Sequence, residues 1–166
     1  MTSIIKVDQI QTAAGGVPTA ADLGLNVSGT VLNVYHLTTG VGVNNTSANY
    51  TTVWSIPYTP VSTNSKIIIS TSLNIRTYRN GGTDSRAAYR LLIDNSEYLT
   101  HTHAGAYDYG GGGIWLSVKY VDHIQYINQT GNQITVSVQT STNNLGPEVY
   151  FNDPAQSHIV FTEIAG

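Results

Sequence analysis

The sequence predicts an all-β fold: an antiparallel β-sandwich, jelly-roll-like, with an extended N-terminal arm. Many short segments alternate between apolar and polar residues with a period of two, which is typical of strands with one buried face. Clusters of Gly, Asn, Asp, Ser and Pro separate these segments at the short spacing of all-β sandwiches. No stretch of the roughly 10 to 12 residues that a helix requires shows helical periodicity.

Three strands are expected in the first half of the chain. Residues 31–37 alternate and end near Gly40. Residues 50–56 alternate again and should end at Pro57, because proline cannot continue a central ladder. The longest strand should span residues 66–78, where a period of two puts one face in the core and the other in water. Its expected buried face consists of Ile67, Ile69, Thr71, Leu73 and Ile75.

Five more strands are expected in the second half, at residues 87–93, 97–102, 114–121, 133–140 and 158–164. The first two flank the sequence Asp94-Asn95-Ser96, which indicates a hairpin. A short apolar segment at residues 149–151 precedes the last strand. About eight strands is the count of a jelly roll, in which two closed sheets protect most of their edges.

The chain divides into an arm and one domain. Its 166 residues have room for a single core. Residues 30–166 hold the expected strands, and residues 1–29 form the N-terminal attachment arm. The arm contains an apolar segment with Ile4, Ile5, Val7 and Ile10 that is too short to bury itself. Since an isolated strand is not stable in water, this segment should dock on a sheet edge of its own chain or of a neighbour.

Composition excludes several classes of function. Charged residues make up 10% of the chain, against about 25% in soluble proteins, and this low charge permits self-assembly. The seven Lys and Arg do not cluster, so no nucleic-acid partner is expected. Cysteine is absent, which excludes disulfides and thiolate metal sites. No apolar run approaches the roughly 18 residues that span a bilayer, so no membrane insertion is expected.

Catalytic motifs are not found in the sequence. A hydrolase-type Gly-x-Ser-x-Gly elbow does not occur, and the ten acidic residues are scattered. The glycines at residues 110–113 have no strand-turn-helix context and no nearby lysine, so they do not form a phosphate-binding loop. The chain is therefore not expected to be an enzyme.

Residues 104–113 form the most unusual segment, with four consecutive glycines after Tyr107, Asp108 and Tyr109. Loops carried on a rigid sandwich commonly hold binding sites. Two aromatic faces and a carboxylate could grip a sugar, so these three residues are the candidate ligand-binding site. The alternative is a flexible hairpin connection without a ligand.

Four segments resemble short fibre and appendage structural proteins of tailed bacteriophages, especially phages of cyanobacteria and marine bacteria. Three of them lie near the N-terminus: IIKVDQIQ at residues 4–11, GGVPTAADLG at 15–24 and GTVL at 29–32. The fourth, FTEIAG at residues 161–166, looks like the closing strand of the same proteins. The resemblance thus brackets the chain and implies a virion part.

The resemblance implies a homotrimer located in the virion and attached through Ile4, Ile5, Val7 and Ile10 to other virion proteins of the tail, neck or capsid. A tail-fibre or receptor-binding knob would present the glycine-rich loop to the host, where a surface glycan is a possible partner. A head fibre or capsid decoration (cement) protein would need no ligand. A free carbohydrate-binding module is a third alternative, in which the arm would have no purpose.

His101 and His103 are the candidate metal ligands. Residues two apart on a strand point the same way, so the two imidazoles would share a face. In a trimer, three such pairs could supply six nitrogens to one axial iron or zinc ion, and long phage fibres contain His-x-His metal sites of this kind. The alternative is a polar strand end without metal, and no other cofactor is expected.

Apolar residues exceed what one small sandwich is expected to bury. Val53, Ile56, Trp115 and Val118 lie in alternating strands, and some of them should line a contact between subunits.

Overall fold

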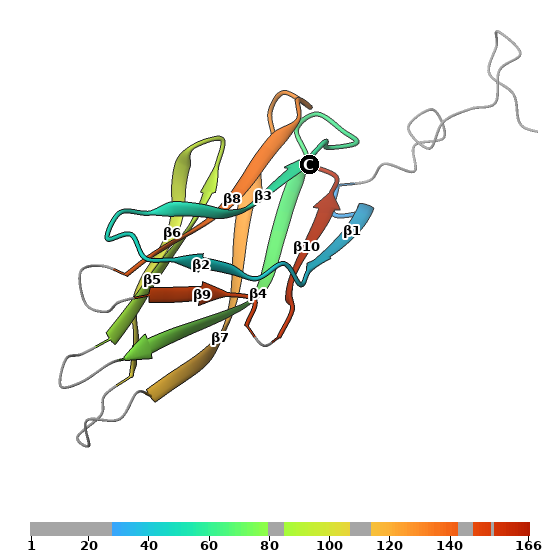
Figure 1. The fold of residues 1–166 in the computed structure, drawn as a ribbon. Coiled ribbons are helices and arrows are strands. Elements are labelled where there is room, and N and C mark those ends of the chain that lie inside the picture. The colour runs from blue at the N-terminus through green and yellow to red at the C-terminus, as the bar shows by residue number, and fades with distance from the viewer. Residues whose placement is uncertain (1–27, 80–84, 107–113, 143–147, 154) are drawn as a thin grey trace, which may run out of the picture.

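The computed structural model describes residues 28–79, 85–106, 114–142, 148–153 and 155–166. The described residues form ten strands and no helix, so the all-β prediction is confirmed (Figure 1). No helix in this part of the chain is long and apolar enough to span a membrane. The strands are β1 (Val31–Thr39), β2 (Val43–Asn45), β3 (Thr51–Tyr58), β4 (Lys66–Arg79), β5 (Ser85–Ile93), β6 (Ser96–Ala106), β7 (Ile114–Ile127), β8 (Ile134–Ser141), β9 (Glu148–Phe151) and β10 (Ser157–Ile164).

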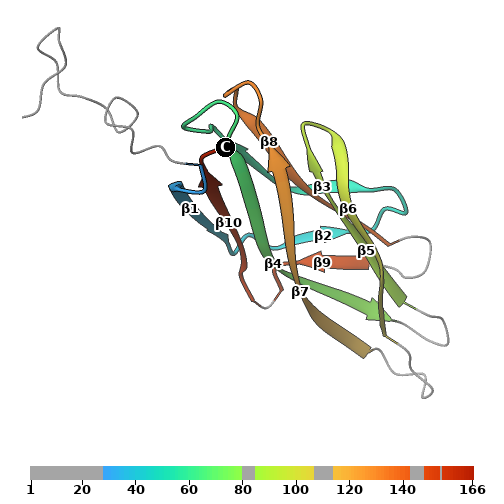
Figure 2. The same ribbon diagram turned by 180° about the vertical axis from the view of Figure 1, so that it is seen from behind.

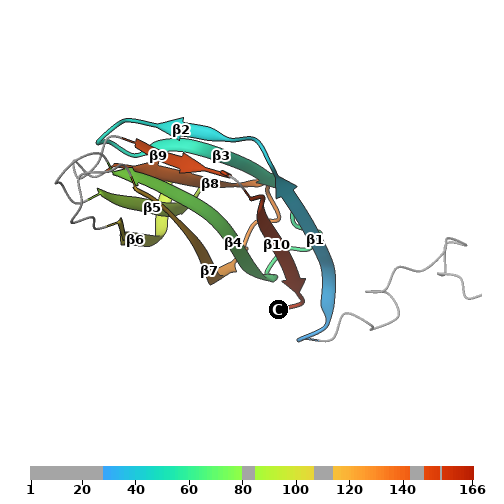
Figure 3. The same ribbon diagram turned by 60° about the horizontal axis from the view of Figure 1, so that its bottom comes forward.

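The strands form two antiparallel sheets. Sheet A has the order β1-β10-β4-β9-β2, and β7 pairs with the other edge of β4. β4 is long enough to pair with β10 along its first half and with β9 along its second half. Sheet B has the order β3-β8-β5-β6. In Figure 3, β1 lies at the outer edge of sheet A beside β10.

The strand order is that of a jelly roll. Apart from the short strands β2 and β9, sheet A reads β1-β10-β4-β7 and sheet B reads β3-β8-β5-β6. Among these eight strands, the first pairs with the last and the second with the seventh. This order corresponds to the two Greek keys of a jelly roll.

Alternation along the strands builds the core. All five residues of the predicted buried face of β4 are buried, whereas the residues between them are partly exposed. The four apolar residues of this face pack against Ile56, Leu91, Val136 and Val138 of sheet B in one apolar cluster between the sheets. Burying one such aliphatic side chain stabilises the fold by about 1.5–3 kcal/mol.

Some strand boundaries differ from the predictions. β3 continues through Pro57 to Tyr58, because β3 is an edge strand that pairs only with β8. β2 has only three residues, which is too short to produce a recognisable alternation. The hairpin between β5 and β6 turns at Asp94 and Asn95, both with positive φ, as predicted.

The predicted subunit-contact residues mostly belong to the core. Ile56 is buried in the core cluster between the sheets, so it is not one of the residues that could line a contact between subunits. Val53 and Val118 are partly buried against the same core. The side chain of Trp115 lies outside the described residues.

Both ends of the domain meet at one end of the sandwich, here called the terminal pole (Figures 1 and 2). The Gly29 N–H donates to the Ala165 carbonyl at 3.0 Å, and the Ala165 N–H donates to the Thr30 carbonyl at 2.8 Å. The opposite end, the distal pole, is where β4 and β7 pair through Arg79 and Ile114. Residues 1–27 lie outside the described residues, so the arm and its boundary stay predictions.

Candidate functional site

His101 links the edge strands of the two sheets. It lies on β6 of sheet B, and Asp122 lies on β7 of sheet A. The His101 Nε2 and the Asp122 Oδ1 are 3.0 Å apart, so a protonated Nε2 donates to the carboxylate. The Asp122 carboxylate also accepts the hydroxyl proton of Tyr89 from β5. One carboxylate therefore connects β5 and β6 to β7.

Aromatic rings surround this polar link. The His101 ring stacks on the Tyr89 ring with centroids 5.0 Å apart, and Tyr120 lies 4.5 Å from Tyr89. Burial, together with the hydrogen bond to Asp122, raises the pKa of the Tyr89 hydroxyl well above its ordinary value. Tyr89 therefore stays protonated and acts as a donor. The arrangement closes one edge of the sandwich and leaves the His101 ring half-exposed.

The structure does not place His101 and His103 as a regular pair. Ala87 pairs with Ala104 whereas Tyr89 pairs with His101, so a bulge in β6 falls between His101 and Ala104. A bulge interrupts the alternation on which the shared face was based. The His103 side chain lies outside the described residues. Among the residues described, no group of three or more His, Asp or Glu side chains could hold a metal ion.

The axial metal site stays a prediction, and elemental analysis tests it. A trimer with the predicted site should contain about one iron or zinc ion per three chains, and His101→Ala should remove it. Removing the metal from the wild-type trimer with a chelator should lower its melting temperature, because bound metal stabilises the folded state. Purified protein without metal after dialysis against iron and zinc would contradict the prediction.

A second polar centre lies at the terminal pole, around the buried carboxylate of Glu163 on β10. The Tyr58 hydroxyl donates to this carboxylate at 2.8 Å. The backbone N–H groups of Val61 and Ser62 donate to it at 2.9 and 3.0 Å. Since β10 belongs to sheet A and Tyr58 to sheet B, Glu163 joins the two sheets and holds the β3–β4 loop.

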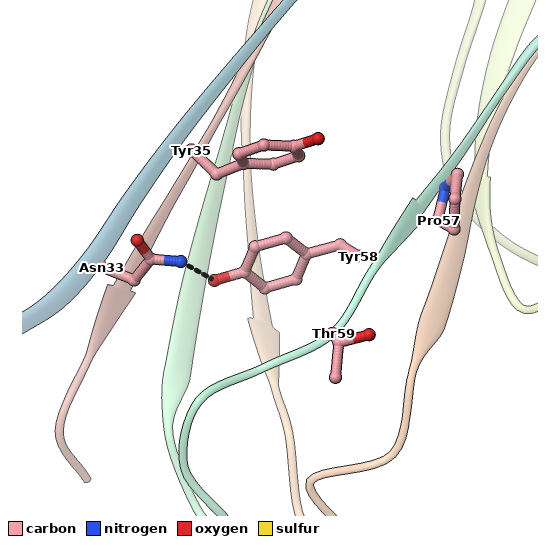
Figure 4. Close-up of a pocket in the computed structure, with 5 residues that line it drawn as sticks. All are labelled: Asn33, Tyr35, Pro57, Tyr58 and Thr59. Atoms are coloured by element: carbon pink, nitrogen blue, oxygen red, sulfur yellow. Dashed lines mark hydrogen bonds between the residues drawn. The ribbon is translucent and has the colours of Figure 1, made fainter.

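A small pocket of about 260 Å³ opens beside this centre, between the edge strands β1 and β3 (Figure 4). Asn33, Tyr35, Pro57, Tyr58 and Thr59 line it. The Asn33 amide donates to the Tyr58 hydroxyl at 3.4 Å, and the Tyr58 ring stacks on buried Phe161 at 4.5 Å. Burial, and the hydrogen bond to Glu163, raise the pKa of Tyr58 to about 12. Asn33 bonds to Tyr58, and Tyr58 in turn bonds to Glu163 and packs on Phe161. The pocket therefore marks the place where β1 of sheet A is joined to β3 of sheet B.

The predicted ligand-binding residues Tyr107, Asp108 and Tyr109 lie outside the described residues, as do Ile4, Ile5, Val7 and Ile10 of the arm. The strands that flank residues 107–113 are described. β6 ends at Ala106, and β7 begins at Ile114 at the distal pole. The candidate loop is therefore connected at the end of the sandwich opposite the termini.

Sequence reasoning did not identify Asp122 or Glu163. Asp122 is 21 residues from His101, and Glu163 is more than 100 residues from Tyr58. One signal was present for each: Asp122 is the only carboxylate on β7 and Glu163 the only one on β10, and a carboxylate within a half-buried strand needs a partner.

Comparisons with known proteins assign no family to the chain. No family model and no curated protein match it. Among solved structures it is similar to a chain in the structure of infectious bursal disease virus, Gx strain, with 15% identity and a TM-score of 0.46 over 84% of this chain and 34% of that one. It is also similar to dimeric latent PorU from Porphyromonas gingivalis, with 10% identity and a TM-score of 0.40 over 84% and 14% of the two chains. The chain thus spans about a third and a seventh of these proteins, and likenesses this weak carry no argument about function.

Proposed function

We propose that the protein is a structural, non-enzymatic component of a tailed-bacteriophage virion: a homotrimeric knob attached through its N-terminal arm, with a receptor-binding loop at the other end. The observation that carries this proposal is the separation of the two poles. Gly29 and Ala165 meet at the terminal pole, and the strands that flank residues 107–113 meet at the distal pole. The resemblance of the terminal segments to phage fibre proteins supplies the class.

The distance between the poles fits a knob with two separate ends. β7 runs from the distal to the terminal pole over 14 residues, which corresponds to about 45 Å at the usual rise of a strand. An arm that holds a virion protein at one pole would leave the other pole exposed to the surroundings. A decoration protein without a ligand has no need of this separation, so the receptor-binding placement is favoured.

Adsorption of phage to host cells tests the receptor-binding placement. Replacing Tyr107 and Tyr109 together by Ala should reduce adsorption at least tenfold, because stacking contributes about a few kcal/mol per site and three copies increase the effect by avidity. Particle yield and the melting temperature of the protein should not change.

The matched control is Tyr98→Ala, because Tyr98 is an exposed tyrosine on the hairpin at the terminal pole. This variant should adsorb normally. Normal adsorption by the Tyr107 and Tyr109 double variant would refute the receptor role and would leave capsid decoration as the better account. Purified trimer that binds host glycan but never joins a particle would favour a free carbohydrate-binding module.

A further inference from the structure

The pocket between β1 and β3 has a floor that the core holds in place. Tyr58 is 3% exposed, and its hydroxyl donates to Glu163 and accepts from the Asn33 amide. Its ring stacks on Phe161 with the two ring planes 4° apart. The floor is therefore positioned by contacts within the protein, and a ligand would not have to order it.

The rim of the pocket, in contrast, is open to solvent. Tyr35 is 41% exposed, and Pro57 and Thr59 on the opposite wall are exposed as well. Figure 4 shows Tyr35 on the β1 side of the pocket, with Pro57 and Thr59 on the β3 side. The Tyr35 ring is tilted by 33° to the Tyr58 ring, with the centroids 6.1 Å apart. A tyrosine ring of this exposure presents apolar surface to a molecule that enters the pocket.

Three polar groups of the pocket have hydrogen-bonding capacity left for a ligand. Among the described residues, the Tyr35 hydroxyl and the Asn33 Oδ1 have no hydrogen-bond partner. The Thr59 Oγ1 accepts from the Gln133 side-chain amide at 3.3 Å, which leaves the Thr59 hydroxyl proton to donate. A ligand that satisfies this set must donate to an amide oxygen and must also exchange hydrogen bonds with two hydroxyls.

The charge of the pocket selects a neutral ligand. None of the five lining residues is charged. The carboxylate behind Tyr58, that of Glu163, is 0% exposed and already accepts from three donors. A charged ligand would lose part of its hydration here without meeting an opposite charge, which is costly.

We propose that this pocket binds one neutral sugar ring of a glycan. Sites for small ligands combine aromatic walls with a few placed polar groups. A pyranose matches both, because its C–H face packs on an aromatic ring and its hydroxyls donate as well as accept. The volume of about 260 Å³ lies just below the ~300 Å³ at which sites for drug-sized ligands begin, so it suits a single ring. A proline-rich peptide would also suit the aromatic wall, but proline has no N–H to donate to Asn33 Oδ1.

Saturation-transfer NMR on the full-length chain tests the site, with the methyl pyranosides of glucose, galactose and mannose as probes. At least one should bind with a dissociation constant of about 1–10 mM, as expected for so small a ligand, and glucuronate should bind at least about tenfold more weakly because of its charge. Thr59→Trp should abolish binding, because Thr59 is exposed and a larger side chain there closes the pocket without entering the core. Tyr35→Phe removes only a hydroxyl and should raise the dissociation constant about three- to tenfold, the usual contribution of one hydrogen bond.

Tyr98→Phe is the matched control, because Tyr98 is 43% exposed and lies on β6, away from the pocket. It should bind the glycosides as the wild type does, and circular dichroism should show the same β-rich fold for every variant. The inference is overturned if none of the three glycosides binds at about 50 mM, if Thr59→Trp binds them normally, or if a tetraproline peptide binds more tightly than they do.

The inference rests on the pocket alone and not on the proposed function, so the two can fail separately. Sugar binding that persists in Thr59→Trp but is lost when Tyr107 and Tyr109 are replaced by Ala would place the sugar at the distal loop. That result would overturn the pocket as a binding site while supporting the receptor role of the loop. Binding lost in Thr59→Trp and kept in the Tyr107 and Tyr109 double variant is the expected result.

Discussion

Deleting residues 1–28 is expected to leave a folded β-sandwich that no longer joins the particle. The described strands begin at Val31, and none of the described residues before it, 28–30, belongs to the apolar core cluster. Gly29 and Thr30 still close the terminal pole through their hydrogen bonds to Ala165. The free energy of unfolding should therefore change by less than about 1 kcal/mol, whereas incorporation should fall to background.

Thermal melting followed by circular dichroism measures the first quantity, and immunoblotting of purified particles measures the second. A full-length variant with Ile4, Ile5, Val7 and Ile10 all replaced by Ser is the control for chain length. It should also fail to incorporate if apolar docking of the arm is the cause. Normal incorporation of the truncated chain would disprove the attachment role.

Replacing Glu163 by Ala should produce the largest loss of stability, about 3–5 kcal/mol. The variant would leave the Tyr58 hydroxyl and the N–H groups of Val61 and Ser62 without their acceptor in a buried site. Each buried donor that loses its partner costs about 1–3 kcal/mol. Glu163→Gln should lose less, because an amide oxygen can still accept from part of the set.

Urea denaturation measures this loss, and Glu148→Ala is the control. Glu148 accepts hydrogen bonds from Asn44 and Tyr150 at the surface, so its removal should cost below about 1 kcal/mol. Equal midpoints for the Glu163 and Glu148 variants would show that the buried carboxylate does not hold the sheets together.

The same site should make the fold sensitive to alkaline pH. The pKa of Tyr58 is about 12 in the folded protein against 10 in the unfolded chain. A raised folded pKa contributes stability that is fully present below pH 10 and is lost as the pH rises toward 12. The urea midpoint of the wild type should fall across this window.

Local features were readable from the sequence. The alternation from Ile67 to Ile75 predicted which face of β4 is buried, because side chains of a strand point to opposite sides of the sheet whatever their partners are. The turn at Asp94 and Asn95 was also predictable, since these residue types tolerate positive φ. Pro57 misled the prediction because its cost depends on whether the strand has a neighbour on that edge.

Candidate sites were only partly predictable. The spacing of His101 and His103 drew attention to β6, but the bulge between His101 and Ala104 depends on pairing with β5. The partner of His101 is Asp122 on the other sheet, which no local pattern indicates. Likewise, Glu163 accepts hydrogen bonds from the N–H groups of Val61 and Ser62, which lie more than 100 residues earlier in the chain.

By itself, the sequence determined the antiparallel all-β class, the buried face of β4 and the turn between β5 and β6, because these depend on side-chain alternation and on backbone preferences of single residues. Only the tertiary structure decided the order of the strands, the two poles and the Glu163 centre. These features arise when strands far apart in the chain become neighbours. Val34, Thr162, Ile68 and Gln125 form one row only because β1, β10, β4 and β7 pair in one register. Such long-range pairing is selected by the packing of the whole core, which no segment contains alone.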